Sequence, residues 1–390
     1  MKTLSTFPIA LSLSAAALAS CAFAQDGESV GTPAEEAGLT VERMGKFDRP
    51  WAIEFIPGSE TLAITEQPGK LILMKTNTGE TLEVSGVPEV AFGGQGGFGD
   101  IAFLESEANR EDGRTIYLSW AELGDGEPGD EGARGAVVGK GLLVCDEKAD
   151  SCAIEGLDVI WRQAPKVTGK GHFSHRIQIS PDEQYLFIAS GDRQKKTPAQ
   201  DLDNTLGTIV RLNLDGTPAE GNPFADQGGV TAQIWSYGHR NILGMDFAPD
   251  GRLWEIEHGP AGGDELNVVT REANYGWPVR SNGDNYNGSD IPDHTADDGF
   301  TKPAIHWTPV IAPSDMIIYT GDMFGPWQGN ALIAGLKTRA IVRVAIDGDT
   351  ATEVGRYTFD KRLRSIAQGP DGSVWVVEQY KNGRLLKISM

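Results

Sequence analysis

Six short apolar segments recur along the 390-residue chain, and each has the partial alternation of a half-buried β-strand. They are residues 61–65, 115–119, 185–189, 252–256, 331–335 and 373–377. Their spacing averages roughly 60 residues, and four of the six follow a proline-centred turn. With 49 glycines and no convincing amphipathic helix, this pattern is typical of a chain built from several copies of one small β-sheet.

A second strand candidate follows each of these segments after a variable loop. The second set is residues 70–74, 141–145, 208–212, 265–269, 340–344 and 384–388. Six irregular copies of a multi-strand unit predict an all-β fold, a six-bladed β-propeller, in which the leftover segment 39–44 closes the ring by pairing with the last blade. Two stacked all-β domains are the alternative. No Pro- or Ser-rich linker divides the chain, so we predict a single propeller domain over residues 38–390.

The start of the chain has the pattern of an export signal. A positive residue precedes the apolar stretch 7–19, which is too short to span a bilayer, and a small-x-small cleavage site ends at Ala24. We therefore expect a signal peptide over residues 1–24. The alternative is a lipoprotein signal over residues 1–20, with the lipid on Cys21. Either route predicts a periplasmic or secreted protein, and the lipoprotein route would anchor it to the outer membrane.

Cysteine use agrees with an oxidising compartment. Once Cys21 is removed or lipidated, Cys145 and Cys152 remain as a pair, for which we predict a disulfide in preference to two free buried thiols. No CxxC or CxxCH motif is present, and no later segment is apolar for long enough to cross a membrane.

The charge balance narrows the range of partners. The chain has 34 basic and 55 acidic side chains, a net charge of −21. Such a chain repels phosphate backbones and anionic lipids, so we expect no nucleic-acid or membrane-surface partner. With 39% hydrophobic residues it still buries a large core.

His172 stands immediately before a predicted hairpin, residues 177–179 and 185–189, at the place where a propeller loop meets the central channel. On an extended segment, His172 and His175 would face opposite ways, which argues against a zinc site in the H-x-x-H pattern. A capped surface histidine is the ordinary alternative to a functional one.

The stretch GGQGGFGD at 93–100 contains G-x-G-x-x-G but is followed by a strand pattern. A dinucleotide fingerprint has to open a helix, so we interpret this match as a coincidence. We expect its glycines to let the backbone approach a flat ligand, with Gln95 as the polar contact.

Two further loops flank the segment 252–256. In SYGHRN, Arg240 supplies a cation beside the amide of Asn241, an arrangement suited to a developing oxyanion. In EHGPAGGDELN, the turn at Gly259 and Pro260 can direct backbone carbonyls outward, with Asp264 and Glu265 nearby, as oxygen ligands of the kind calcium prefers.

Three basic residues stand out in an acidic chain: Lys337, Arg362 and Arg364. The i, i+2 spacing of the two arginines places both guanidiniums on one side of a strand. Such a set suggests a small polyanionic ligand such as a carboxylated cofactor, and a solvated patch is the alternative.

Taken in order, these stretches resemble a known family. PWAIEFIPG, GGQGGFGDIAF, HFSHRI, SYGHRN, EHGPAGGDELN through NYGWP, IAPSDMIIYTGD, GLK and RLRSIAQGPDG are similar to the motifs of the pyrroloquinoline quinone (PQQ)-dependent soluble glucose and aldose sugar dehydrogenases. The resemblance extends from about Gly38 to the C-terminus. That family's fold is a six-bladed propeller, which the repeat pattern predicts independently.

The resemblance implies roles for individual residues. His172 matches the general base for the sugar C1 hydroxyl, while hydride passes from C1 to the quinone C5 and the product is a lactone. Arg240, with Asn241 beside it, matches the residue that holds the quinone oxygen. The other cofactor-binding matches are Gln95, Lys337, Arg362 and Arg364.

The metal sites and the electron acceptor are implied in the same way. Gly259 and Pro260 match a Ca²⁺ bound through backbone carbonyls, and Glu265 with Tyr275 matches a second, structural Ca²⁺. The substrate is then a small-molecule aldose. Because the chain has no haem motif, electrons must leave to a separate periplasmic acceptor.

Some features depart from the family pattern. His172-Phe173-Ser174-His175 stands where relatives read HFGG or HFGS, and Ile242-Leu243 replaces Pro-Gln. The polar loop 280–299 is expected over the channel. Two other functions stay open: a calcium-dependent lactonase propeller, which has no need for the basic set, and a non-catalytic binding propeller, whose candidate residues would not converge.

Overall fold

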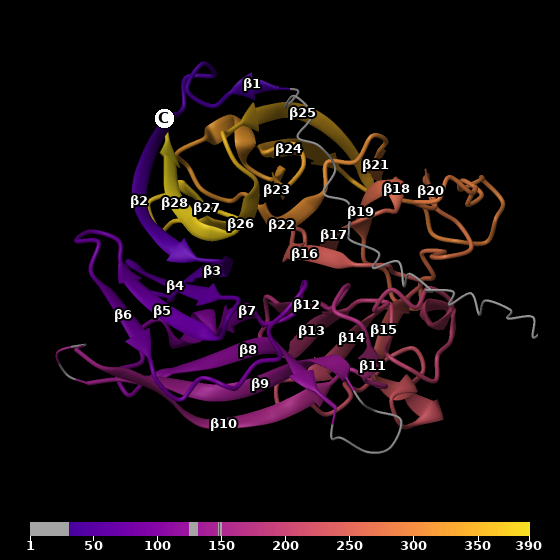
Figure 1. The fold of residues 1–390 in the computed structure, drawn as a ribbon, viewed down its shortest axis with the longest axis horizontal. Coiled ribbons are helices and arrows are strands. Elements are labelled where there is room, and N and C mark those ends of the chain that lie inside the picture. Colours follow the sequence, from indigo (N-terminus) through magenta and orange to yellow (C-terminus); the bar gives the residue numbers. More distant parts are fainter. Residues whose placement is uncertain (1–30, 125–131, 147, 149) are drawn as a thin grey trace, which may run out of the picture.

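The computed structural model describes residues 31–390 apart from 125–131, 147 and 149. The expected signal segment, residues 1–24, and the alternative lipid site Cys21 lie outside this part. The described residues form 28 strands, which build six sheets of four or five strands around a common axis and one two-stranded ribbon (Figure 1). The all-β six-bladed propeller is confirmed. In the described part, no helix is long and apolar enough to cross a membrane.

Each blade has four main strands, and its first strand contacts the first strands of the two neighbouring blades around the axis. From the axis outward, blade 1 contains β3 (Pro50–Phe55), β4 (Thr61–Glu66), β5 (Lys70–Lys75) and β6 (Thr81–Val84); blade 2 contains β7 (Phe98–Phe103), β8 (Arg114–Leu123), β9 (Ala133–Cys145) and β10 (Cys152–Arg162); blade 3 contains β12 (Ser174–Ile179), β13 (Tyr185–Ser190), β14 (Thr208–Asn213) and β15 (Ile234–Tyr237). Blade 4 contains β16 (Ile242–Phe247), β17 (Leu253–Glu257), β19 (Asp264–Val268) and β21 (Ile305–Trp307); blade 5 contains β22 (Pro313–Ile318), β23 (Ala331–Gly335), β24 (Ala340–Asp347) and β25 (Thr350–Thr358); blade 6 contains β26 (Leu363–Gln368), β27 (Val374–Glu378), β28 (Lys381–Ser389) and β2 (Thr40–Asp48).

Short elements complete the chain. The minor strands are β1 (Thr32–Pro33), which pairs with β25, β11 (Val167–Thr168), which pairs with β9, and β18 (Ala261–Gly262), which pairs with β20 (Gly283–Asp284). The 3₁₀ turns are η1 (Glu105–Glu107), η2 (Thr197–Gln200), η3 (Ala225–Gln227), η4 (Thr231–Gln233) and η5 (Gly325–Trp327).

The repeat pattern locates the strands correctly. The six segments that begin at 61, 115, 185, 252, 331 and 373 are the second strands of the blades, and the six that follow them lie in the third strands. The segment 39–44 lies in β2, which pairs antiparallel with β28, so the expected closure of the ring is confirmed. The first long strand of the chain is thus the outer strand of blade 6, next to the last strand of the chain.

The apolar core lies mainly between neighbouring blades. One large cluster joins blades 1 and 2 through residues such as Leu71 and Trp120, and another joins blades 5 and 6 through residues such as Ile341 and Leu386. At the edge of blade 2, the expected disulfide joins Cys145 of β9 to Cys152 of β10.

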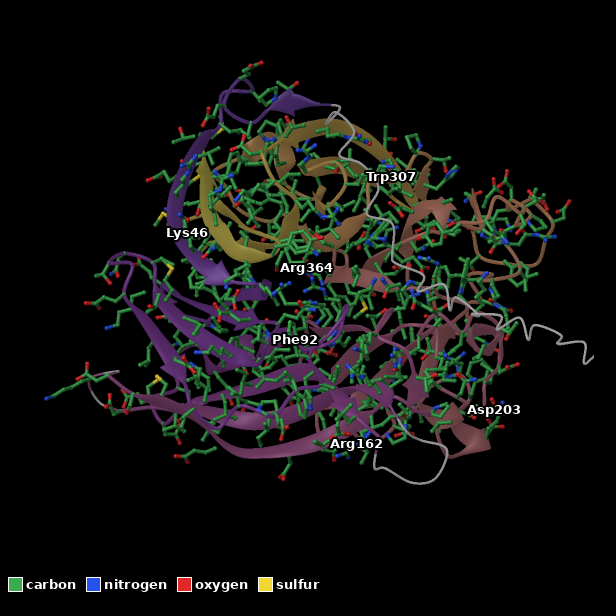
Figure 2. All side chains as sticks on the ribbon, in the orientation of Figure 1. Lys46, Phe92, Arg162, Asp203, Trp307 and Arg364 are labelled. Carbon is green, nitrogen blue, oxygen red and sulfur yellow. A yellow bond between two sulfur atoms is a disulfide. The ribbon has the colours of Figure 1, made fainter. Side chains whose placement is uncertain are left out.

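Every first strand carries a bulge near its start, where its register against the second strand shifts. The residues displaced from the ladders are Trp51; Gly99 and Asp100; His175 and Arg176; Leu243; Ser314; and Arg364. A bulge bends its strand and redirects a side chain. Figure 2 shows Arg364 near the centre of the ring, whereas Lys46 and Arg162 lie at its periphery.

Arg176 links most of these bulges across the axis. Its guanidinium donates to Asp100 Oδ1 at 2.8 Å in blade 2, to the Leu243 carbonyl at 2.6 Å in blade 4 and to the Ser314 carbonyl at 2.7 Å in blade 5. It also lies 4.3 Å from the ring centre of Trp51 in blade 1.

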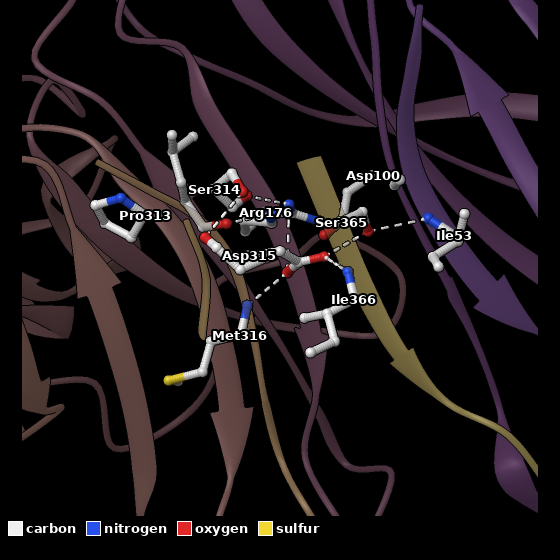
Figure 3. A network of polar contacts seen from close by, with 12 residues as sticks. Ile53, Asp100, Arg176, Pro313, Ser314, Asp315, Met316, Ser365 and Ile366 are labelled. Atoms are coloured by element: carbon white, nitrogen blue, oxygen red, sulfur yellow. Dashed lines mark hydrogen bonds and ion pairs between the residues drawn. The ribbon is translucent and has the colours of Figure 1, made fainter. Parts of the chain in front are cut away.

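Asp315 extends this network to the last blade. One carboxylate oxygen lies 3.3 Å from the Arg176 guanidinium, and the other accepts hydrogen bonds from Ser365 Oγ and the Ile366 amide of blade 6 (Figure 3). Burial, only partly offset by the Arg176 charge, raises the pKa of Asp315 to about 6. All six blades thus meet around one buried guanidinium.

This network spans the channel at the bulges of the first strands. Beyond it lies a cavity of about 440 Å³, lined by the far halves of the first strands and by carboxylates that include Glu54 and Asp246. Burial raises the pKa of Asp246 to about 7.

We expect Arg176→Met to destabilise the fold by about 3–5 kcal/mol, because Asp100 and Asp315 would stay buried without their cation. Equilibrium denaturation at pH 7.5 measures this change. The control is Arg252→Met, because Arg252 pairs with the more exposed Asp250 and Asp349, and its loss should cost about 1 kcal/mol or less. Equal losses in the two variants would contradict a central role for Arg176.

Candidate active site

The candidate residues gather at one end of the propeller axis. At this end each first strand begins and each second strand ends, because the two strands are antiparallel. Gln95, His172 and Arg240 precede the first strands of blades 2, 3 and 4, and Lys337 follows β23. The loops predicted to carry function therefore meet on one side of the Arg176 network.

The backbone around His172 is not extended, so the strand alternation assumed from the sequence is wrong. His172, Ser174 and His175 have φ values of 50°, 56° and 50°. This left-handed stretch turns the His175 ring against Trp51, with ring centres 4.9 Å apart, while His172 is directed to other partners. The two histidines still do not form a zinc pair, because they contact different groups: Ser119 for His175 and Asp192 for His172.

His172 is held on two sides. Its backbone amide donates to Gln95 Oε1 at 2.6 Å, and its Nδ1 lies 2.7 Å from Asp192 Oδ1. The carboxylate requires a proton on Nδ1, so Nε2 is left as the free acceptor. Burial and the nearby Arg240 charge lower the pKa of His172, which keeps the ring neutral and able to accept a proton.

Asp192 is a site residue that the sequence analysis missed. Burial tends to raise its pKa, but the hydrogen bond and charge of His172, with Arg240, bring the pKa below its ordinary value. Trp277 Nε1 donates to its second oxygen at 2.8 Å, and its own amide donates to the Arg240 carbonyl at 2.9 Å. Asp192 thus fixes the imidazole and links it to the Arg240 loop.

Arg240 is positioned by blade 4. Glu257 accepts hydrogen bonds from the amides of Arg240 and Asn241 at 2.6 and 3.2 Å. The Arg240 guanidinium donates to the His258 carbonyl at 3.0 Å and to the Tyr286 hydroxyl at 3.2 Å, while its Nε is buried without a partner.

His258 is a second residue that the sequence analysis did not identify. Its Nε2 donates to the Pro313 carbonyl at 2.6 Å. Burial and the Arg240 charge lower its pKa to about 3, so the ring is neutral. Nothing in the sequence around it, other than its place beside Gly259, marks it as a channel residue.

Tyr286 belongs to the polar loop expected over the channel, and its contact with Arg240 places the loop there. The side chain remains 77% exposed. Asn285 beside it accepts a hydrogen bond from Lys196 Nζ at 2.7 Å, which ties the loop to blade 3.

The basic residues have few anionic partners. Arg364 is buried against the Trp51 ring at 4.7 Å, and burial with the neighbouring Arg176 lowers its pKa to about 9. Arg362 lies half-buried before β26 and donates to Gln379 Oε1 at 2.7 Å, while Lys337 is exposed. Within the described chain, the side chains of Arg364 and Lys337 make no hydrogen bond or ion pair.

Gly259 and Pro260 form a tight buried turn. The Gly259 amide donates to Asp264 Oδ1 at 2.9 Å, and Asp264 Oδ2 accepts from the Ala312 amide at 2.6 Å. Among the described residues, none donates a hydrogen bond to the carbonyls of Gly259 and Pro260. These two oxygens are available to a cation.

Glu265 and Tyr275 line a void of about 10 Å³, room for one water-sized occupant. Burial raises the pKa of Glu265, whose Oε1 accepts a hydrogen bond from Asn282 at 3.2 Å. The Tyr275 hydroxyl is already bonded to the Val268 carbonyl, so only its backbone carbonyl is free to act as a ligand.

The sequence and the fold of this chain are similar to those of known proteins. Residues 47–387 match the family model described as glucose / sorbosone dehydrogenase. The Escherichia coli aldose sugar dehydrogenase YliI is 37% identical over 88% of this chain and 91% of its own length. The crystal structure of the E. coli soluble aldose sugar dehydrogenase in its apo form has a TM-score of 0.82 and 36% identity, covering 90% of this chain and 99% of that one.

More distant relatives share the fold. Quinoprotein glucose dehydrogenase B of Acinetobacter calcoaceticus is 24% identical over 91% of this chain and 89% of its own length. A PQQ-bound structure of aldose sugar dehydrogenase from Streptomyces coelicolor has a TM-score of 0.71 at 24% identity, covering 90% of this chain and 98% of that one. From the family match over most of its length and the similarity to the E. coli enzyme, the chain belongs to the glucose / sorbosone dehydrogenase family.

Proposed function

We propose that this protein is a PQQ- and calcium-dependent dehydrogenase that oxidises the C1 hydroxyl of aldose sugars to lactones. The observation that carries the proposal is the buried pair His172–Asp192, a neutral base whose free nitrogen lies at the end of the channel that also holds Arg240 and the unpaired Arg364. The names of the relatives support the same substrate class.

The residues fit a tricarboxylic quinone. The side chains of Arg364 and Lys337 make no hydrogen bond or ion pair in the described chain, Arg362 is bound only to a neutral amide, and Arg240 has an unpaired buried Nε. Such groups would bind carboxylates and a quinone oxygen, with Gln95 and Asn241 at the edge of the site. When bound, PQQ would supply the two-electron acceptor for the hydride that leaves C1.

The metal ligands fit calcium in the same way. The carbonyls of Gly259 and Pro260 offer hard oxygen ligands beside Arg240, where Ca²⁺ would polarise the cofactor. Glu265 and the Tyr275 carbonyl would hold a second, structural Ca²⁺ in the small void between them.

The chain's own groups account for the proton transfer. His172 Nε2 takes the proton of the C1 hydroxyl as the C1 hydrogen leaves as hydride, and Asp192 stabilises the imidazolium that results. Arg240 provides a fixed positive charge where negative charge develops on the acceptor. The proton is then released to solvent, and the electrons pass to a separate carrier.

Neither of the two alternative functions, a calcium-dependent lactonase and a non-catalytic binding propeller, uses all of these groups. A calcium-dependent hydrolase has no need for Arg362, Arg364 and Lys337 around the channel, and a binding-only propeller has no need for a neutral histidine on a buried carboxylate. The disulfide supports export to an oxidising compartment, so we place the reaction in the periplasm or outside the cell, with a soluble or lipid-anchored protein as the two forms.

The first test adds PQQ and Ca²⁺ to the metal-free protein, followed by an aldose and a dye acceptor, with absorbance as the readout. We expect binding that needs Ca²⁺ and reduction by sugar. His172→Gln should retain binding and lose about 10²–10⁴ in the rate of reduction. The exposed His306→Gln is the matched control. Failure to bind PQQ would exclude the proposal.

The pH dependence of kcat/KM tests the protonation state of His172. Because burial and Arg240 lower the pKa of His172, kcat/KM should fall only below about pH 6.5. Asp192 raises the pKa of His172, so Asp192→Asn should move this acid limb to lower pH. The plateau should also fall, by about 10² or more, because the imidazolium loses its partner. An acid limb above pH 6.5 in the native enzyme would contradict this assignment.

Gly259→Ala tests the carbonyl turn. An added Cβ would lie 2.1 and 2.2 Å from the carbonyl oxygens of Gly262 and Gly263, so the turn must open, at a cost of about 1–3 kcal/mol. We expect the Ca²⁺ concentration that gives half-maximal PQQ binding to rise at least about tenfold. Gly325→Ala, where the added Cβ meets nothing, is the control. Unchanged Ca²⁺ dependence would place the calcium elsewhere.

A further inference from the structure

A buried cluster of two glutamates and one histidine in blade 4 has no ligand assigned to it in the proposed function. Glu255 and Glu257 lie two residues apart on β17 and share one face of the sheet, and His239 comes from the segment before β16. One ligand atom from each of the three residues lies within 4.8 Å of the others. All three side chains are 5% exposed or less.

The carboxylates of this cluster form no ion pair with lysine or arginine in the described chain. Glu265 and Asn267 on β19 pair with Glu257 and Glu255 across the ladder, so a third carboxylate lies on the same face. Among the described residues, His239 is the only basic side chain that pairs with Glu255 and Glu257. Buried carboxylates are normally paired or bind a metal.

Two oxygen atoms of the cluster are also left without partners. Glu255 Oε2 and Asn267 Oδ1 are buried and accept no hydrogen bond. Asn267 Nδ2 donates to the other Glu255 oxygen at 2.7 Å, which fixes the orientation of that carboxylate. A buried acceptor without a donor is costly, and a cation would satisfy it.

His239 is held in the orientation of a metal ligand. Its Nε2 lies 2.9 Å from Ser236 Oγ, and its ring stacks on Tyr275 with centres 4.4 Å apart. Its Nδ1 then lies 3.3 Å from Glu257 Oε1 and 3.7 Å from Glu255 Oε1. These separations are close to the ~3.3 Å between ligand atoms of a tetrahedral ion with bonds of about 2.0 Å.

We propose that His239, Glu255 and Glu257 bind a divalent transition-metal ion of the zinc type, at a site separate from the calcium sites at Gly259 and Glu265. One imidazole nitrogen and a few carboxylate oxygens in a tight, buried space suit zinc, whereas calcium takes six to eight oxygens. Glu257 also lines the small void proposed above for the second Ca²⁺, so the two proposed sites are adjacent but use different ligands.

The ion would act on the channel through Glu257. One oxygen of Glu257 faces His239, and the other accepts the hydrogen bonds from the amides of Arg240 and Asn241. A metal on the first oxygen would fix the carboxylate, and with it the backbone from which Arg240 extends. The site is therefore structural, and it does not depend on the redox proposal.

The test is metal titration of the chelator-treated full-length protein, with Zn²⁺ followed by melting temperature and metal analysis and with Co²⁺ followed by its visible d–d absorption. We expect one equivalent of either ion and a higher melting temperature with Zn²⁺. Glu255→Gln and His239→Gln should each weaken Zn²⁺ binding at least about 100-fold. Glu265→Gln, which removes the proposed structural calcium ligand, should leave the Co²⁺ spectrum unchanged.

Two outcomes would overturn the assignment. If the native protein binds neither Zn²⁺ nor Co²⁺ and Glu255→Gln raises the melting temperature, Glu255 holds a proton and the cluster is metal-free. If only Ca²⁺ raises the melting temperature, and Glu255→Gln abolishes that effect, the cluster is an additional calcium site. The native titration decides the question even if a variant fails to fold.

Discussion

The structure depends on the buried guanidinium of Arg176. From blade 3 it bonds to groups of blades 2, 4 and 5, packs on Trp51 of blade 1, and reaches blade 6 through Asp315. These contacts occur at the bulges that begin the first strands. Because Gln95, His172 and Arg240 stand three or four positions before these bulges, the same contacts fix their place. Without these contacts, the loops of different blades would not be held in fixed positions relative to one another.

The site is correspondingly rigid, and each of its loops is tied to a neighbouring blade. Glu257 holds the Arg240 backbone, the Arg240 carbonyl accepts from Asp192, and Asp192 orients His172, whose amide is bound to Gln95. Blades 4, 3 and 2 are joined in this order. Arg240 also serves two electrostatic purposes, because its charge helps to keep His172 neutral while its guanidinium stays available for an anion. Preorganisation of this kind places the fixed charges before any ligand arrives.

The strands and their ring closure could be predicted because local alternation and spacing reflect short-range geometry. The backbone at His172 could not, since positive φ at three non-glycine residues is imposed by the bulge and has no local signal. Asp192 could have been found: Ser174 pairs with Ser190, so the residues two positions beyond that pair, His172 and Asp192, must lie side by side. The reach of Arg176 and the grouping of His239 with Glu255 arise from contacts between distant segments, and only the folded chain reveals them.

The pairing of β2 with β28 has a consequence for the order of folding. The two strands come from opposite ends of the chain, and the register runs from Thr40 opposite Ser389 to Asp48 opposite Lys381. β2, the outer strand of blade 6, therefore has no partner strand until the last residues of the chain have been synthesised. Contacts of such large sequence separation form late, because loop closure has to precede them. A nascent chain of this design therefore stays incompletely folded throughout its synthesis, and the ring is sealed only after its last strand has been made.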